Sequence, residues 1–382
     1  MTHVGIDIEQ FTIDPYGSGI QRVLQYLALE WPDDGPTCNF VLPHPHGHLL
    51  LTPAQAAQVL SVPFAAGTSD SGEIRALVAD AIAGADGVVV EPGTLLSIFD
   101  RWLLPEVSYL PAVLDRLELL AECMPVVMIG YDALPMIEPA NYRFPPGTAA
   151  QVSRYFHLLV RADAVVCISE YSRSSIWDRL RRRRSAVTTV AHPGGDHITP
   201  QPAEPSDSQY PTLIKVGTLE ARKKPVETID AFRLMRDNGW QGQLVLLGRP
   251  SASDPEINQA VRSAVEQDIG VTWIHDARDE DVLAHLRNAD LFLSLGTEGY
   301  GIPVLEAISQ GIPVVFDGIQ PAAELMEGRG ATRIDATDAI TLAESLQRAA
   351  GTRDQLADAI DIRAIPTWRD FVRGVVAVLG NP

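Results

Sequence analysis

The stretch 291–323, LFLSLGTEGYGIPVLEAISQGIPVVFDGIQPAA, constrains the fold of this chain more than any other. Its apolar run at 291–295 predicts a strand, and a glycine-rich turn follows at 296–301. A helix is predicted from Pro303, and a second buried strand over 312–316. A strand, loop, helix and strand in this order are typical of a parallel sheet, whose ligands bind beyond the carboxyl ends of the strands.

The glycine-rich turn has the composition of an anion site. Gly299 and Gly301 let a ligand approach the backbone closely, and Pro303 suits the first helical position. The free amides and the helix dipole there attract phosphate. Glu298 in the turn and Glu306, which we expect in the first helical turn, then remain for sugar and ribose hydroxyls. An acid in a first turn also stabilises the helix dipole without any ligand.

The run EGYGIPVLE resembles the E-x7-E motif of the retaining nucleotide-sugar glycosyltransferases of family 4. The resemblance implies that Glu298 contacts the donor sugar and Glu306 the ribose. It also implies donor contacts from the residues around these acids: Gly299, Tyr300, Gly301, Ile302 and Val304.

Two further segments of the second half extend this resemblance. The run VGTLEARKKP looks like the family's VGxLxxRKN segment, which implies that Lys223 reaches the diphosphate and that Arg222 supports it. An exposed basic turn is the alternative. Gly248 and the segment 273–276, which includes Ile274, lie where this architecture holds the base through backbone groups.

The first half resembles the family more loosely. GSGIQRV follows a predicted strand at 4–8 and is similar to a family segment that faces the interdomain cleft, so Gly17, Ser18 and Gly19 are candidate donor or acceptor contacts. A plain tight turn is the alternative. Tyr131 stands where the family commonly has a histidine, and remains a candidate hydrogen-bond donor. Asp132 is a candidate too, or else it caps the next turn.

A chain of 382 residues predicts two domains. The resemblance implies the GT-B architecture, an α/β fold with two Rossmann-like doubly wound domains facing across a cleft. We expect an acceptor-side domain over 1–197 and a proline-rich linker over 198–210. The donor-binding domain follows over 211–365. The resemblance implies that a last helix over 366–382 crosses back to the first domain. Within the first domain, the region 97–120 is predicted helical, with breaks at Pro105 and Pro111.

Composition limits the partners and the location. A net charge of −19 argues against sequence-independent nucleic-acid binding. Three separated cysteines indicate a reducing cytosol, no membrane-spanning helix is expected, and the first residues lack the pattern of a signal peptide. The basic cluster at 179–184, Arg179 included, suggests contact with an anionic membrane or a lipid-linked acceptor. A solvated helix end is the alternative.

No metal or cofactor is expected. His44, His46 and His48 alternate among prolines and a glycine, which favours an exposed loop over a metal site. The residues 279–281 match a D-x-D pattern, but helix capping explains them more simply.

The sequence therefore predicts an enzyme that moves a sugar from a nucleoside-diphosphate sugar, with configuration retained. GDP-mannose is slightly favoured as donor, and the acceptor is a hydroxyl of a glycan, a lipid-linked molecule or a small molecule. A non-catalytic sugar-nucleotide-binding protein and a nucleotide-sugar epimerase remain alternatives. A phosphorylase with pyridoxal phosphate is disfavoured, because Lys215 lies in a predicted strand and the other two lysines lie in the phosphate loop.

Overall fold

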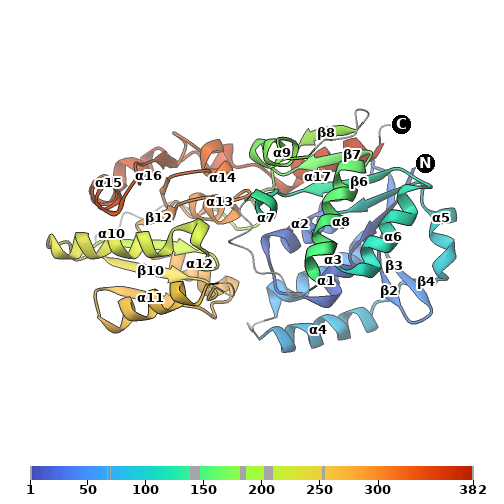
Figure 1. The fold of residues 1–382 in the computed structure, drawn as a ribbon, viewed down its shortest axis with the longest axis horizontal. Helices are drawn as coiled ribbons and strands as arrows, with labels where there is room; N and C mark the ends of the chain where they lie inside the picture. The colour runs from blue at the N-terminus through green and yellow to red at the C-terminus, as the bar shows by residue number, and fades with distance from the viewer. Residues whose placement is uncertain are drawn as a thin grey trace. The chain divides into compact units, whose positions relative to one another are not determined.

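The computed structural model describes residues 2–66, 68, 70–137, 147–180, 186–201, 210–251 and 254–380 (Figure 1). The chain forms two α/β units, each built on its own, mostly parallel sheet. Unit 1 comprises Met1–Ala133, Phe144–Pro193 and Thr367–Pro382, and unit 2 comprises Leu134–Arg143 and Gly194–Pro366. Unit 2 thus includes 194–197, which the sequence analysis placed in the first domain. The arginines at 181–184 and most of the proline-rich linker lie outside the described residues.

The sheet of unit 1 has the order β4-β3-β2-β1-β5-β6-β7-β8. The strands β2-β1-β5-β6-β7-β8 run parallel, and β3 and β4 add an antiparallel extension. The strands are β1 (His3–Asp7), β2 (Thr37–His44), β3 (Gly47–Leu51), β4 (Val88–Val90), β5 (Arg101–Leu104), β6 (Val126–Gly130), β7 (Ala164–Cys167) and β8 (Val187–Val190). The helical segments are α1 (Glu9–Ile13), α2 (Gly19–Leu29), α3 (Pro53–Ala65), α4 (Ser71–Ala83), η1 (Pro92–Thr94), α5 (Leu95–Ile98), α6 (Pro111–Ala121), α8 (Thr148–Arg161), α9 (Glu170–Trp177) and α17 (Trp368–Gly380).

One sequence expectation for this unit was wrong. Within the region predicted helical at 97–120, residues 101–104 form β5, which lies between β1 and β6 at the centre of the sheet. Trp102, Leu103 and Leu104 are all buried there. A run of three apolar residues has no period that separates a strand from a helix, so tertiary pairing decides its conformation.

The sheet of unit 2 is entirely parallel, with the order β11-β10-β9-β12-β13-β14. Chain order reverses between β9 and β12, so this is a doubly wound sheet with its switch point there. Its strands are β9 (Thr212–Val216), β10 (Gln243–Leu247), β11 (Val271–Ile274), β12 (Leu291–Ser294), β13 (Val314–Phe316) and β14 (Ala331–Arg333). Its helices are α7 (Leu134–Ile137), α10 (Pro225–Asp237), α11 (Pro255–Glu266), α12 (Asp279–Arg287), α13 (Ile302–Ser309), α14 (Pro321–Leu325), α15 (Ala339–Gly351) and α16 (Arg353–Asp358), with short 3-10 turns η3 (Ala221–Lys223) and η4 (Ile362–Ala364).

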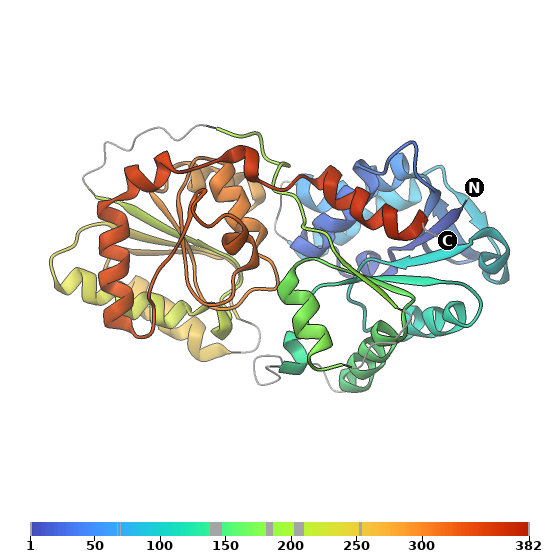
Figure 2. The same ribbon diagram turned by 90° about the horizontal axis from the view of Figure 1, so that it is seen from above.

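Helices lie on both faces of this sheet (Figure 2). On one face, apolar residues of α10, α11 and α15 form a core cluster with the strands, which includes Phe232, Val261 and Leu346. The two apolar strands predicted in the stretch 291–323 are β12 and β13. Both consist only of buried residues, as strands covered on two faces require.

The last helix, α17, belongs to unit 1 although it follows unit 2 in the chain. Figure 2 shows it, in red, among the blue and green elements of that unit. Trp368 stacks on Tyr26 of α2, with ring centroids 4.5 Å apart and planes 11° apart. Phe371, Val372 and Val375 share its buried face, which matches the amphipathic pattern.

We expect Trp368→Ala to destabilise unit 1 by about 3–5 kcal/mol, because it removes a buried ring together with its stacking contact to Tyr26. The measurement is urea unfolding followed by circular dichroism. Leu119→Ala on the exposed side of α6, where Leu119 is 57% exposed, is the control and should leave the midpoint unchanged. Equal midpoints for both variants would contradict the role given to α17.

Candidate functional site

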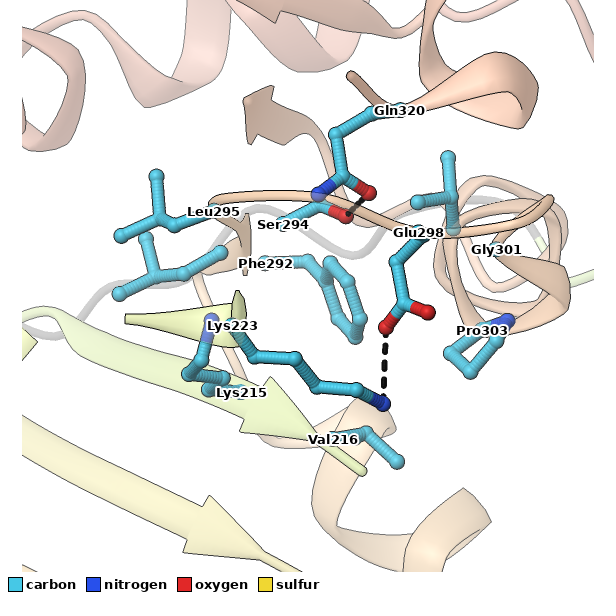
Figure 3. A pocket seen from close by; sticks show the side chains of 12 residues that line it. Lys215, Val216, Lys223, Phe292, Ser294, Leu295, Glu298, Gly301, Pro303 and Gln320 are labelled. Carbon is cyan, nitrogen blue, oxygen red and sulfur yellow. Dashed lines mark hydrogen bonds and ion pairs between the residues drawn. The ribbon is translucent and has the colours of Figure 1, made fainter. Parts of the chain in front are cut away.

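A pocket lies at the switch point of the unit 2 sheet (Figure 3). Residues of β9, β12 and the loops that follow them surround it, as the topology of a doubly wound sheet predicts. Its lining residues are Lys215, Val216, Lys223, Phe292, Leu293, Ser294, Leu295, Glu298, Gly301, Pro303, Val304 and Gln320.

Lys223 enters the pocket from η3, the short turn after β9. Its Nζ lies 2.8 Å from Oε1 of Glu298, the contact drawn in Figure 3. Gly217 makes room for this side chain, because a Cβ at 217 would lie 2.8 Å from Lys223 Nζ. The φ of Gly217 is 131°, which also favours glycine. The turn after β9 is therefore shaped to place an ammonium group beside Glu298.

Arg222 binds the same carboxylate from the other side. Its Nη1 donates to Glu298 Oε2 at 2.8 Å and to the carbonyl oxygen of Thr297 at 2.6 Å. Its Nη2 lies 2.5 Å from Glu220 Oε2. The backbones of the two loops also meet, because Thr297 N–H donates to the Arg222 carbonyl at 2.8 Å. A Cβ at Gly296 would lie 1.9 Å from that carbonyl oxygen, so only glycine permits this approach.

The charge state of Glu298 follows from these two cations. Burial opposes its ionisation, but Lys223 and Arg222 outweigh burial and lower its pKa to about 2. The side chain is 22% exposed and remains an anion at neutral pH. The sequence prediction that Lys223, Arg222 and Glu298 lie together agrees with this geometry.

Lys224 and Asp317 connect the same loops. The sequence analysis counted Lys224 as part of the phosphate loop and gave Asp317 no role. Lys224 forms an ion pair with Asp317, and Asp317 Oδ1 accepts the N–H of Gly296 at 2.8 Å. Lys224 has a left-handed backbone, with φ 53°, just before α10 begins at Pro225. The adjacent lysines thus have different tasks: Lys223 faces the pocket, and Lys224 ties η3 to the loop after β13.

Glu306 differs from its expected position. The helix α13 begins at Ile302, with Gly301 as its N-cap at φ 103°, so Glu306 lies in the second turn instead of the first. Its Oε1 accepts a hydrogen bond from His197 Nε2 at 2.8 Å, with both side chains largely buried. Glu306 is not among the residues that line the described pocket. His197 lies in the segment that enters unit 2, and no local pattern pointed to it.

The other residues predicted around the turn are arranged as follows. Gly301 and Val304 line the pocket. Gly299 and Ile302, which are close to these two residues in sequence, are partly buried. Tyr300 is 4% exposed, so a donor contact there would come from its backbone.

Gly248 is the residue after β10, Ile274 is the last residue of β11, and the two are hydrogen-bonded to each other. The N–H of Gly248 donates to the Ile274 carbonyl at 2.9 Å, and the Gly248 carbonyl accepts from the Trp273 indole at 2.9 Å. The two residues predicted to hold a base are therefore adjacent, but two hydrogen bonds within the protein already involve three of their backbone groups.

The predicted glycine turn of unit 1 is an N-terminal cap. Ser18 Oγ accepts the N–H of Gln21 at 3.2 Å at the start of α2, and Gly17 has φ 69°. The buried Gln21 accepts the N–H groups of Tyr16 and Gly17, both at 2.9 Å. Gly17 and Ser18 thus have structural roles that involve no ligand, and Gly19 is the first residue of α2.

Tyr131 is buried at the end of β6, and its hydroxyl donates to the Pro105 carbonyl at 2.6 Å. Burial, with Glu106 nearby, raises its pKa well above the usual value, so the phenol stays protonated. In this structure the hydroxyl proton of Tyr131 is used in the hydrogen bond to Pro105, inside unit 1. The neighbouring Asp132 is half-buried.

Lys215 is a lining residue that sequence reasoning assigned no binding role. It lies near the end of β9 and is 7% exposed. Burial and the nearby ammonium of Lys223 lower its pKa to about 7, against weaker attraction from Glu298, Asp317 and Glu227. Only the burial of its strand, visible once the sheet is assembled, distinguishes it from an ordinary surface lysine.

Other surface predictions are less informative. Arg179 is exposed at the end of α9, and its neighbours at 181–184 lie outside the described residues. His44 ends β2, and His48 lies in β3, so the histidine run forms a hairpin and its turn. Within the described ranges, no cluster of three or more His, Cys, Asp or Glu is placed to hold a metal ion. None of the helices described there is long and apolar enough to span a bilayer.

Comparison with known proteins gives this site a family context. Residues 199–361 match the family model described as Glycosyl transferases group 1. The chain is 25% identical over 189 residues to the serotype-specific mannosyltransferase WbdA of Escherichia coli, a match that covers 44% of this chain and 23% of WbdA. It is 28% identical over 185 residues to the O-antigen chain mannosyltransferase B of Escherichia coli, covering 44% of this chain and 47% of that protein. The chain therefore spans less than half the length of these relatives.

Solved structures show the fold. The sucrose-phosphate synthase of Thermosynechococcus elongatus matches with a TM-score of 0.64 and 14% identity, over 99% of this chain and 98% of that one. HepE of Anabaena, solved in complex with UDP-glucose, matches with a TM-score of 0.60 and 14% identity, over 100% of this chain and 96% of that one. The two parallel-sheet units thus form a GT-B fold, as predicted. The family match and the mannosyltransferase relatives support a glycosyltransferase enzyme.

Lys215→Met should change how stability depends on pH. The pKa of Lys215 is lowered from 10.5 to about 7 on folding, so between these values the unfolded chain binds more protons at this residue. The cost of burying the charged lysine is fully present below pH 7 and falls as pH rises towards 10. We therefore expect the methionine variant to gain most over the wild type at low pH, and its advantage to shrink at high pH.

The measurement is the free energy of unfolding in urea at pH 6.5 and pH 9.5. Arg348→Met, at an exposed position of α15, is the matched control, because arginine keeps its charge across this range. A constant difference between Lys215→Met and the wild type at the two pH values would refute the lowered pKa.

Proposed function

We propose that the chain is a retaining glycosyltransferase of family 4 that uses a nucleoside-diphosphate sugar. The observation that carries this proposal is the group formed by Lys223, Arg222 and Glu298 beside the start of α13. Cations at the switch point suit a diphosphate, and the carboxylate suits sugar hydroxyls. The match of residues 199–361 to a glycosyltransferase family supports the same reading.

In the proposed reaction the acceptor hydroxyl attacks the anomeric carbon of the donor sugar as the bond to the diphosphate oxygen breaks. The hydroxyl proton passes to the departing phosphate, so no protein nucleophile is required. Lys223, Arg222 and the amides at the start of α13 stabilise the negative charge that builds on the leaving group. Glu298 then exchanges part of its contact with the cations for contact with the sugar.

Glu306 is proposed to bind the ribose of the donor, as its place in the E-x7-E motif implies. His197 holds its carboxylate at 2.8 Å, which fixes the orientation of one oxygen. Gly299, Tyr300, Ile302, Gly248 and Ile274 remain proposed donor contacts through their backbones. Gly17, Ser18, Gly19 and Asp132 remain proposed contacts of donor or acceptor.

A mannosyl donor, GDP-mannose, is our first choice. Both curated relatives described above are mannosyltransferases. The structural neighbour HepE binds UDP-glucose, which keeps a uridine donor as the second choice. The acceptor is proposed to be a glycan, a lipid-linked molecule or a small molecule with a free hydroxyl. The cytoplasmic location and the membrane contact of residues 179–184 stay predictions.

A non-catalytic sugar-nucleotide binder is the second candidate, and one observation favours it. The hydroxyl of Tyr131, at the position of the family's usual histidine, is bonded to Pro105 and buried. No histidine then stands at this position to assist the reaction. Turnover by the purified protein would exclude this alternative, and an epimerised donor would identify an epimerase.

The donor base can be identified by thermal unfolding with UDP, GDP, ADP and dTDP. A ligand at 100 times its dissociation constant adds about 2.7 kcal/mol to stability, which raises the unfolding temperature measurably. We expect GDP to give the largest shift, with inorganic phosphate at the same ionic strength as the control. The absence of a shift with all four nucleotides would count against the proposed donor class.

Lys223→Met should lower the rate of sugar transfer about 100-fold, because it removes one charged contact to the leaving group. The assay measures release of nucleoside diphosphate from the donor identified by thermal unfolding. Arg348→Met removes a cation of the same unit far from the pocket residues in sequence, and should keep wild-type activity. An active Lys223→Met variant would remove Lys223 from the proposed mechanism.

A further inference from the structure

A lysine in the middle of a parallel sheet is unusual, because such strands are covered on both faces and consist mainly of apolar residues. Lys215 lies in β9 between Ile214 and Val216, paired in register with Leu246 of β10. Its side chain is almost completely buried. Burying an unpaired charge is costly, so a lysine retained here needs a counter-charge or a second role.

The carboxylates near Lys215 already have partners. Glu298 pairs with Lys223 and Arg222, and Asp317 pairs with Lys224. Glu227, in the first turn of α10, is the remaining acidic group that acts on Lys215. Among the described residues, none of these carboxylates forms an ion pair with the Lys215 ammonium. Its environment is therefore short of negative charge.

Lys215 nevertheless opens on the pocket, together with Lys223, Glu298 and the first residues of α13. Figure 3 shows Lys215 and also Lys223, whose ammonium group extends towards Glu298. The pocket thus has two amine groups and the amino end of a helix, against one carboxylate. A space with this balance favours an anion more than any single one of these groups does.

We propose that Lys215 is a second amine that binds the diphosphate of the donor. The amine takes up a proton from solvent when the anion enters the pocket and then contacts the anion as an ammonium group. This inference rests on the proposed function, because it assumes that the anion is the diphosphate of a nucleotide sugar.

The charges around Lys215 explain why uptake would accompany binding. Burial disfavours a proton on Lys215 and the ammonium of Lys223 adds to this effect, which together lower the pKa of Lys215 to about 7. A diphosphate supplies negative charge to the same space and so raises the proton affinity of the amine. The protein thereby avoids a permanently buried charge and gains a cation only when an anion is present.

The sequence makes a direct test possible, because Lys215, Lys223 and Lys224 are the only lysines in the chain. Protein labelled with carbon-13 at the lysine Cε gives three signals, and Lys215→Met identifies the signal of Lys215. Each signal is followed by nuclear magnetic resonance from pH 5.5 to pH 10, with saturating inorganic pyrophosphate and with sodium chloride at equal ionic strength. The signal reports the protonation of the lysine itself and not that of the pyrophosphate.

In sodium chloride we expect the Lys215 signal to titrate near neutral pH, and in pyrophosphate we expect its midpoint to rise by about one unit or more. Because about half of the Lys215 amine is already protonated at pH 7, a rise of one unit corresponds to about a fivefold change in affinity at this pH. We therefore expect Lys215→Met to weaken pyrophosphate binding at pH 7 about fivefold or more in calorimetry. Arg348→Met is the control and should bind as the wild type does.

Two results would overturn the inference: a Lys215 midpoint that pyrophosphate does not move, or unchanged pyrophosphate affinity in Lys215→Met. Neither result touches the proposed function if the wild type transfers sugar. Conversely, a midpoint raised by pyrophosphate in a protein that turns over no nucleotide sugar would establish the amine's response to an anion and refute the transferase proposal.

Discussion

The contact of Glu298 with Lys223 and Arg222 holds the site of this protein together. The three side chains come from the loops after β9 and β12, the two strands at which chain order reverses. The backbone prepares the contact, because Gly217 and Gly296 leave space that a Cβ would fill. Lys224 and Asp317 support it from behind. The ion pairs and the close backbone contacts at the glycines therefore depend on one another.

Such a cluster serves binding more than stability. Taking charges out of water costs much of what their attraction returns, so partly buried ion pairs contribute little net stability and much specificity of position. The carboxylate of Glu298 keeps two cations aimed at one place before any ligand arrives. An incoming anion therefore meets groups that are already oriented, and it replaces a contact instead of having to order two long side chains.

The sequence predicted the parts of the site that are contiguous in the chain. The run from β12 through α13 and the basic turn at Arg222 and Lys223 each combine strand, glycine and helix signals within a few residues. Contacts between distant segments left no such signal. The bonds of His197 to Glu306 and of Tyr131 to Pro105 depend on how the sheets assemble. The same holds for β5, since only its pairing with β1 and β6 distinguishes this short run from a helix.

The position of α17 has a consequence for how the molecule is made. Unit 1 takes its first strands from the beginning of the chain and α17 from residues after Pro366, so unit 2 is an insertion within it. On the ribosome, a nascent chain has all of unit 2 available before the helix that covers Tyr26 has been synthesised. The inserted unit can therefore reach its native state first. Unit 1 keeps an apolar surface uncovered until the thirteen residues of α17 have been synthesised.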